Sequence, residues 1–290
     1  MLGLAFGSFL NTCASRWPED ESAVKPRSHC RSCGRTLCWW ENIPLLSWLA
    51  LRGRCRTCHE PIGWRYLLIE FAVAALWAYS VWQTFAVAPE LNAGIITYNA
   101  ALAIANGTAR LIFLWILAAL AVLDAENLWL PDRLTLPGIA LGLLLSVTRE
   151  TLDTFMNYPP SFTVWAHLAI NGIVLYWFVA AVISAGVLLV IRFIYQFFRG
   201  QEGIGMGDVK LMAMLGGWLG ATQALLALGL GAICGSLVVL FLLAVPSLRA
   251  KFKDMSKTPL PFGTFIVTGG IVAAFWGEEI VATYRHWGGF

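Results

Sequence analysis

Long hydrophobic runs separated by short polar segments dominate this sequence of 290 residues and constrain its fold more than any other feature. Charged residues make up only 13% of the chain, about half of the roughly 25% found in soluble domains. Hydrophobic residues make up 58%, so the composition excludes an ordinary cytosolic enzyme. The sequence predicts an all-α polytopic membrane protein with about eight transmembrane helices, at residues 1–15, 64–88, 108–130, 134–148, 168–198, 209–221, 224–245 and 262–284.

Basic residues are unevenly spread and predict the orientation of these helices. Nine of the 20 Lys and Arg residues lie between Arg16 and Arg65. Loops rich in Lys and Arg stay in the cytoplasm, so we place this loop there. One crossing per segment then puts 17 of the 20 basic residues on the cytoplasmic side and the N-terminus in the periplasm. We therefore predict a multi-pass membrane protein, without a nucleic-acid partner.

The first 15 residues lack the basic start and the cleavage site of a signal peptide, so we expect a first membrane helix. Its length falls short of the ~30 Å hydrocarbon core unless it is truncated, tilted or thins the bilayer. Gly3 and Gly7 form a small-xxx-small pair that could pack helices, although such pairs are common by chance in membrane segments. The predicted organisation is a first helix (1–15), a cytoplasmic cysteine loop (16–63) and a membrane core (64–290).

Two Cys-x2-Cys knuckles stand in the basic loop with 21 residues between them, namely Cys30, Cys33, Cys55 and Cys58. Four thiolates at this type of spacing close a tetrahedral Zn²⁺ site. Two disulfides are the alternative, but the reducing cytoplasm disfavours them. We therefore predict a structural zinc site that folds a loop with few apolar residues of its own. Neighbouring side chains that could substitute as ligands are His29, Cys38 and His59.

Two carboxylates lie where hydrophobic segments meet the cytoplasmic face. An ionisable residue inside a membrane costs at least ~2.5 kcal/mol on insertion scales, so it indicates a functional role. Asp124 follows Arg110 by fourteen residues in one segment, and Asp208 stands where the chain re-enters the membrane. We expect both acids at similar depth on the cytoplasmic side.

The glycines before Asp208, at positions 203, 205 and 207, remove side chains from the turn that enters the helix. Such a turn permits unusual backbone angles and lets an extended peptide approach closely. A phosphate-binding loop is the alternative, but no alternating strand and helix pattern surrounds it, and the adjacent carboxylate would repel phosphate.

Two carboxyl groups at a partly desolvated site share one proton and titrate as a pair. The charged member can activate a water molecule, while the protonated member polarises a carbonyl group and protonates the leaving amine. This is the chemistry of an aspartic protease, although Asp124 and Asp208 could also be helix caps. Three neighbours have open roles: Glu70 could pair with Arg65 or face the site, Lys210 could bias the pair's charge or extend to the membrane surface, and Asp132 could cap a helix.

Five segments together resemble the bifunctional type IV prepilin peptidases. They are GSFLN at 7–11, the knuckles that flank ENIPLLSWLALRGRC at 41–55, WRYLLIE at 64–70, LD…LPD at 123–132 and GMGDVKL at 205–211. The resemblance implies an inner-membrane aspartic endopeptidase of the GxGD type. Such enzymes remove the basic leader of prepilins and type II secretion pseudopilins, then methylate the new N-terminal residue with S-adenosylmethionine.

By position, the resemblance makes Asp124 and Asp208 the catalytic pair and places Gly205, Gly207 and Lys210 in the active-site loop. It links the cysteine loop to methylation and to zinc. The sequence departs from the family in a shorter first helix and a longer stretch at about 149–168, which we expect in the periplasm. No methyl-donor motif is visible. A non-enzymatic assembly factor and a proton-coupled transporter are the competing hypotheses.

Overall fold

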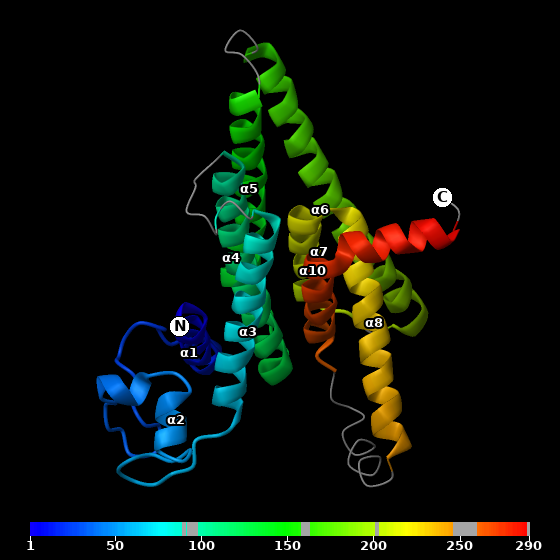
Figure 1. Cartoon of the computed structure of the whole chain (residues 1–290). Coiled ribbons are helices and arrows are strands. Elements are labelled where there is room, and N and C mark those ends of the chain that lie inside the picture. The colour runs from blue at the N-terminus through cyan, green and yellow to red at the C-terminus, as the bar shows by residue number, and fades with distance from the viewer. Residues whose placement is uncertain (89–90, 92–97, 158–162, 201–202, 246–259, 289–290) are drawn as a thin grey trace. The chain divides into compact units, whose positions relative to one another are not determined.

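The computed structural model describes residues 1–88, 91, 98–157, 163–200, 203–245 and 260–288 (Figure 1). These residues are largely helical, and within them the only β-structure is two isolated bridges in the cysteine loop. The α-helices are α1 (Leu2–Arg16), α2 (Leu46–Ala50), α3 (Arg65–Val87), α4 (Tyr98–Asn127), α5 (Asp132–Asn157), α6 (Thr163–Arg199), α7 (Met206–Leu219), α8 (Ala221–Ala244) and α10 (Phe262–Gly288).

Every hydrophobic segment predicted from the sequence contains a helix, which confirms an all-α membrane fold. Among the described residues, however, only five helices are long and apolar enough to cross a membrane. They are Arg65–Val87, Ala100–Asn127, Gly172–Arg199, Ala221–Ala244 and Phe262–Gly288. The predicted number of eight spans is therefore not confirmed. The helices α1 and α7 have 15 and 14 residues, too few for a core of ~30 Å at ~1.5 Å per residue.

The chain divides into two compact units, Met1–Ala119 and Leu120–Phe290. In the first unit, α1 packs against α3 through the two glycines noted in the sequence. A Cβ atom at Gly7 would lie 2.7 Å from Cα of Glu70, and one at Gly3 would lie 2.9 Å from Cα of Ala74. A larger residue at either position would therefore push the two helices apart.

The second unit is built around α7, whose side chains Leu211, Met212, Met214 and Leu215 are fully buried. The helices α5, α6 and α8 contact α7, and α8 and α10 lie side by side (Figure 1). Most of the large exposed side chains of α6 and α8 are apolar, for example Phe193, Phe197, Leu237 and Phe241. This distribution suits helices whose outer faces contact lipid, and it makes the buried acid of α7, Asp208, unusual.

Candidate functional site

Two aspartates from different helices meet in the second unit. Asp124 lies near the end of α4 and Asp208 in the first turn of α7, and their exposed fractions are only 6% and 8%. A Cβ atom at Gly263 of α10 would lie 3.0 Å from Oδ2 of Asp124 and equally 3.0 Å from Oδ1 of Asp208. These two oxygens are therefore at most about 6 Å apart, twice that distance. At such a separation two carboxyl groups interact strongly enough to share a proton.

Thr264 in the first turn of α10 holds Asp124 in place. Its backbone N–H donates to Oδ2 of Asp124 over 2.6 Å, and its hydroxyl lies 3.0 Å from the same oxygen. The hydroxyl also lies 3.1 Å from the carbonyl oxygen of Ala121. The N–H groups of a first helical turn have no partner within their own helix, and this end of a helix favours negative charge. Asp124 therefore caps α10 from a neighbouring helix.

Sequence reasoning missed both Gly263 and Thr264. A side chain at position 263 would crowd both carboxylates, since its Cβ would lie 3.0 Å from one oxygen of each. A single Thr in an apolar run gives no signal by itself. The available clue was that Pro261 precedes them at the start of the last hydrophobic segment, which marks a helix N-terminus with unpaired donors.

The glycines before Asp208 act through packing. Among the described residues, the glycines with positive φ are Gly34, Gly53, Gly200 and Gly220, so the glycines at 203, 205 and 207 do not use the left-handed angles that glycine permits. A Cβ atom at Gly203 would instead lie 2.5 Å from the ring of Tyr195, and one at Gly207 would lie 2.9 Å from Leu130. Close approach of neighbouring segments therefore explains these two glycines. Gly205 caps α7 and would place a Cβ only 3.5 Å from Oδ2 of Asp208.

Lys210 and Asp132 form an ion pair beside the acid pair. Nζ of Lys210 lies 2.6 Å from Oδ1 of Asp132, the first residue of α5. Both side chains are partly exposed, so the pair contributes little stability. It nevertheless ties α7 to α5. Nη1 of Arg192 on α6 donates to the carbonyl oxygen of Ile204 over 2.9 Å, which fixes the loop before α7.

The four cysteines of the two knuckles converge in the first unit. The Sγ atoms of Cys30, Cys33, Cys55 and Cys58 all lie within 4.8 Å of one another. Those of Cys30 and Cys58 are 3.7 Å apart, close to the ~3.8 Å required by tetrahedral coordination with Zn–S bonds of ~2.3 Å. His29, Cys38 and His59 do not join this group. The donor set therefore fits Zn²⁺ and needs no substitute ligand.

The two knuckles have the same local structure. In the first knuckle, the backbone N–H of Cys30 donates to the carbonyl oxygen of Arg35, and the N–H of Gly34 donates to the carbonyl oxygen of Cys30. In the second knuckle, the N–H of Cys55 donates to the carbonyl oxygen of Glu60, and the N–H of His59 donates to the carbonyl oxygen of Cys55. Gly34 and His59 both have positive φ at the end of their turns. Backbone N–H groups of Cys58 and Thr57 lower the pKa of the Cys55 thiol, whereas burial and the neighbouring thiols raise the pKa of Cys58. A bound metal would hold all four cysteines as thiolates.

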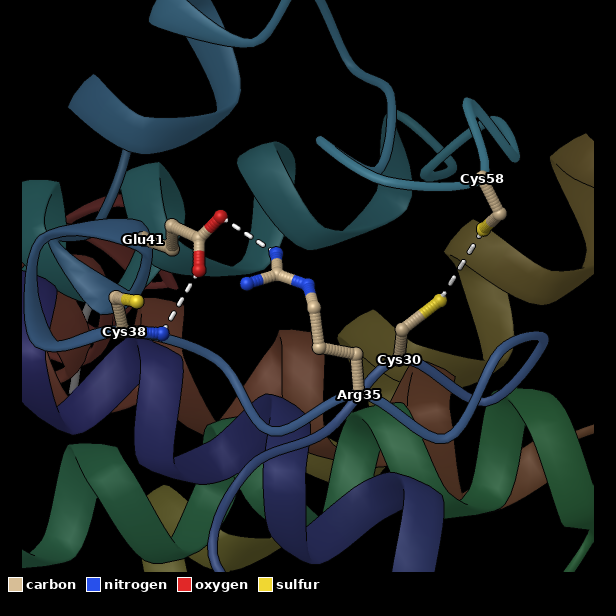
Figure 2. A network of polar contacts seen from close by, with 5 residues as sticks. All are labelled: Cys30, Arg35, Cys38, Glu41 and Cys58. Carbon is tan, nitrogen blue, oxygen red and sulfur yellow. Dashed lines mark hydrogen bonds and ion pairs between the residues drawn. The ribbon is translucent and has the colours of Figure 1, made fainter.

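A buried ion pair supports the loop between the knuckles (Figure 2). Nη2 of Arg35 lies 2.6 Å from Oε1 of Glu41, and the backbone N–H of Cys38 donates to Oε2 over 2.7 Å. The Glu41 side chain is only 1% exposed and that of Arg35 is 27% exposed. The Arg35 guanidinium lowers the pKa of Glu41, so the carboxylate stays charged. This pair fixes the turn Trp39–Asn42 relative to the first knuckle.

Two known protein families match parts of this chain. Residues 1–84 match the bacterial peptidase A24 N-terminal domain, and residues 111–240 match the type IV leader peptidase family. Asp124 and Asp208 lie within the second match and the four cysteines within the first. No solved structure matches the chain.

Curated relatives align with all or nearly all of this chain. A prepilin leader peptidase/N-methyltransferase of Pseudomonas putida is 32% identical and aligns with 100% of this chain and 93% of its own length. The protein of that name from Pseudomonas aeruginosa is also 32% identical with the same coverage. One from Burkholderia pseudomallei is 34% identical over 96% of this chain and 84% of its own. With two domain matches and relatives that align over its full length, the chain belongs to the type IV leader peptidase family.

Proposed function

We propose that this multi-pass membrane protein removes the leader peptide of type IV prepilins and type II secretion pseudopilins and methylates the new N-terminal amine. The observation that carries the peptidase proposal is the convergence of Asp124 and Asp208 around Gly263. Two buried carboxyl groups at this distance supply an acid and a base at one point. An assembly factor would have no need of two desolvated acids this close together.

The hydrogen bonds around the pair suggest which acid does what. Asp124 accepts two donors from Thr264, and donors to a carboxylate stabilise its charged form. We therefore assign Asp124 as the base that removes a proton from the attacking water. Asp208 would hold the shared proton, polarise the scissile carbonyl and pass the proton to the leaving nitrogen. Gly205 and Gly207 keep the approach to Asp208 free of side chains.

We assign the metal to Cys30, Cys33, Cys55 and Cys58 as a structural Zn²⁺ site. The loop of residues 16–63 buries few apolar side chains, so metal binding would supply much of its folding free energy. The remainder, 1–15 and 64–290, would form the membrane part. Positive charge in the loop and the depth of both acids favour a cytoplasmic site, where anionic lipids would attract the basic leader.

The methylation half of the proposal takes its support from the curated names of the relatives. S-adenosylmethionine would supply an electrophilic methyl group. The amine nitrogen forms a bond to the methyl carbon, the carbon–sulfur bond breaks with its electron pair on sulfur, and the nitrogen loses one proton.

Substitution of the acids tests the peptidase proposal. Asp124→Asn and Asp208→Asn should each lower prepilin cleavage in membranes by at least about a hundredfold, the scale of general acid–base catalysis. Protein levels should stay unchanged. Asp132→Asn is the matched control, since its side chain is 55% exposed and pairs with Lys210. Cleavage by both acid variants at the wild-type rate would refute the aspartic mechanism and favour an assembly factor.

A further inference from the structure

A cavity of about 630 Å³ lies in the first unit, between α1, the cysteine loop and the start of α3. Its walls include Asn11, Glu41, Trp48, Cys55, Tyr66 and Glu70. Pockets that hold small molecules have volumes of roughly 300–1,000 Å³. All its lining residues lie within Met1–Ala119, whereas the two aspartates lie within Leu120–Phe290. The cavity is therefore a second site, separate from the acid pair.

Glu70 is the most informative residue of this cavity. It stands on α3 with an exposed fraction of 8%, and its Oε2 accepts the backbone N–H of Leu45 over 2.8 Å. The ion pairs found among the described residues do not include Glu70. A buried carboxylate without a cation is costly. This one faces a cavity large enough to admit a cationic ligand.

A second acceptor in the same wall lacks a donor. Asn11 is 3% exposed, and its Nδ2 donates to the carbonyl oxygen of Tyr66 over 3.0 Å, so the orientation of the amide is fixed. Its Oδ1 has no hydrogen-bond partner in the described part of the chain. Unpaired buried acceptors are rare and call for an explanation.

Glu41 differs from these two residues because Arg35 and the Cys38 amide already satisfy its carboxylate. Arg16 lines the same cavity, but its Nη1 already donates to the carbonyl oxygens of Ser22 and Pro26. Among the residues that the structure describes, Glu70 and Asn11 therefore remain the carboxylate without a cation and the amide oxygen without a donor on the side formed by α1 and α3. Trp48 and Tyr66 add aromatic surface to the same walls. An enclosure with carboxylate, amide oxygen and aromatic groups suits a compact ligand that carries positive charge, hydroxyl groups and a flat ring.

We propose that this cavity binds the methyl donor S-adenosylmethionine and that Glu70 contacts its positively charged end. The proposal rests on the methyltransferase half of the proposed function. The ligand's sulfonium and ammonium groups match Glu70, while its hydroxyl and amino groups can donate to Asn11. Cys30 and Cys55 line the same cavity, so a metal on the knuckles would fix one of its walls.

Ultraviolet crosslinking of labelled S-adenosylmethionine to the purified full-length protein tests the location without any substitution. Mass spectrometry should find the label on peptides within residues 1–70. An N-terminal prepilin peptide should not displace it, since the cavity would hold the nucleoside and not the peptide chain. Label on peptides of the second unit, or displacement by the peptide, would overturn the proposal.

Equilibrium binding to the variant Glu70→Gln tests the contact. Glutamine retains an acceptor for the Leu45 amide, so the fold should persist and prepilin cleavage should stay near wild type. Affinity for S-adenosylmethionine should fall by about tenfold or more, since hydrogen bonds to charged groups are among the stronger ones. Affinity for S-adenosylhomocysteine, whose sulfur is uncharged, should fall less.

Two controls separate the possible failures. Glu60→Gln makes the same change on an exposed residue of the cavity rim and should bind the donor as wild type does. Asp124→Asn should lose cleavage and keep donor binding, because it lies in the other unit. Unchanged affinity in Glu70→Gln would refute the cavity assignment and leave the peptidase proposal intact. Prepilin cleavage by the variant Asp124→Asn would refute only the peptidase proposal.

Discussion

Asp124 differs from other acids of the chain in what surrounds it. Two donors of Thr264 contact one of its oxygens, and Gly263 leaves room for the carboxylate of Asp208 beside it. The backbone donor belongs to the helix and would survive any substitution that preserves α10. The hydroxyl donor and the missing Cβ depend on residue type, so both can be tested directly.

Thr264→Val removes the hydroxyl and keeps the backbone N–H and the side-chain shape. We expect cleavage to fall by about tenfold or more, since a hydrogen bond to a charged group contributes roughly 1.5–3 kcal/mol. The rate of prepilin cleavage in membranes measures the effect. Thr268→Val is the matched control, because its exposed hydroxyl only contacts its own helix. Equal losses in both variants would contradict a specific role for Thr264.

Gly263→Ala adds a methyl group 3.0 Å from one carboxylate oxygen of Asp124 and from one of Asp208. At least one acid must move, and we expect cleavage to fall at least roughly tenfold, since a misplacement of 1 Å can cost about a hundredfold. Thermal unfolding should show that the protein remains folded. Gly186→Ala provides the comparison, because nothing lies within 4 Å of a Cβ there. A fully active Gly263→Ala would mean that the acids do not require this close packing.

At the scale of elements, the first turns of α7 and α10 supply residues of the acid site. Asp208 is the third residue of α7, and Thr264 is the third residue of α10. The N-terminal ends of both helices, where donors are unpaired, thus lie at the acid pair. In the cysteine loop, short turns and the five-residue α2 take the place of long helices. The buried Arg35–Glu41 pair holds two of these turns together.

Arg35→Gln leaves Glu41 buried without its cation. Loss of one partner of a buried ion pair costs about 3–5 kcal/mol, so we expect the loop to become sensitive to protease and to lose metal more readily. Limited proteolysis and zinc content measure these effects. Arg27→Gln, on an exposed residue of the same loop, should behave as wild type. An intact loop in Arg35→Gln would show that the metal site alone stabilises it.

At the scale of the whole molecule, the two units separate the two proposed activities. The cysteine cluster and the cavity belong to Met1–Ala119, and the acid pair belongs to Leu120–Phe290. The helix α4 passes through the boundary between them. A defect in one unit should therefore affect its own activity first.

Replacement of Cys30 and Cys58 by Ser removes two of the four thiolates. We expect the bound zinc to be lost and methylation to fall before cleavage does, since the acids lie in the other unit. Metal analysis and separate assays of the two activities on purified protein check this order. Loss of cleavage with methylation retained would contradict the division of labour between the units.

The sequence by itself determined the helical membrane fold, the four-cysteine set and the two aspartates. Hydrophobic runs, cysteine spacing and charges in apolar segments are local features. Each can be recognised within one continuous stretch of the chain, without knowledge of which helices pack together. Only the tertiary structure decided that Asp124, Asp208, Gly263 and Thr264 share one point, that glycines before Asp208 serve packing, and that Lys210 pairs with Asp132. These depend on which helices pack together, and residues separated by 140 positions carry no local sign of their contact. The cavity beside Glu70 has the same origin, because the packing of α1, the loop and α3 creates it.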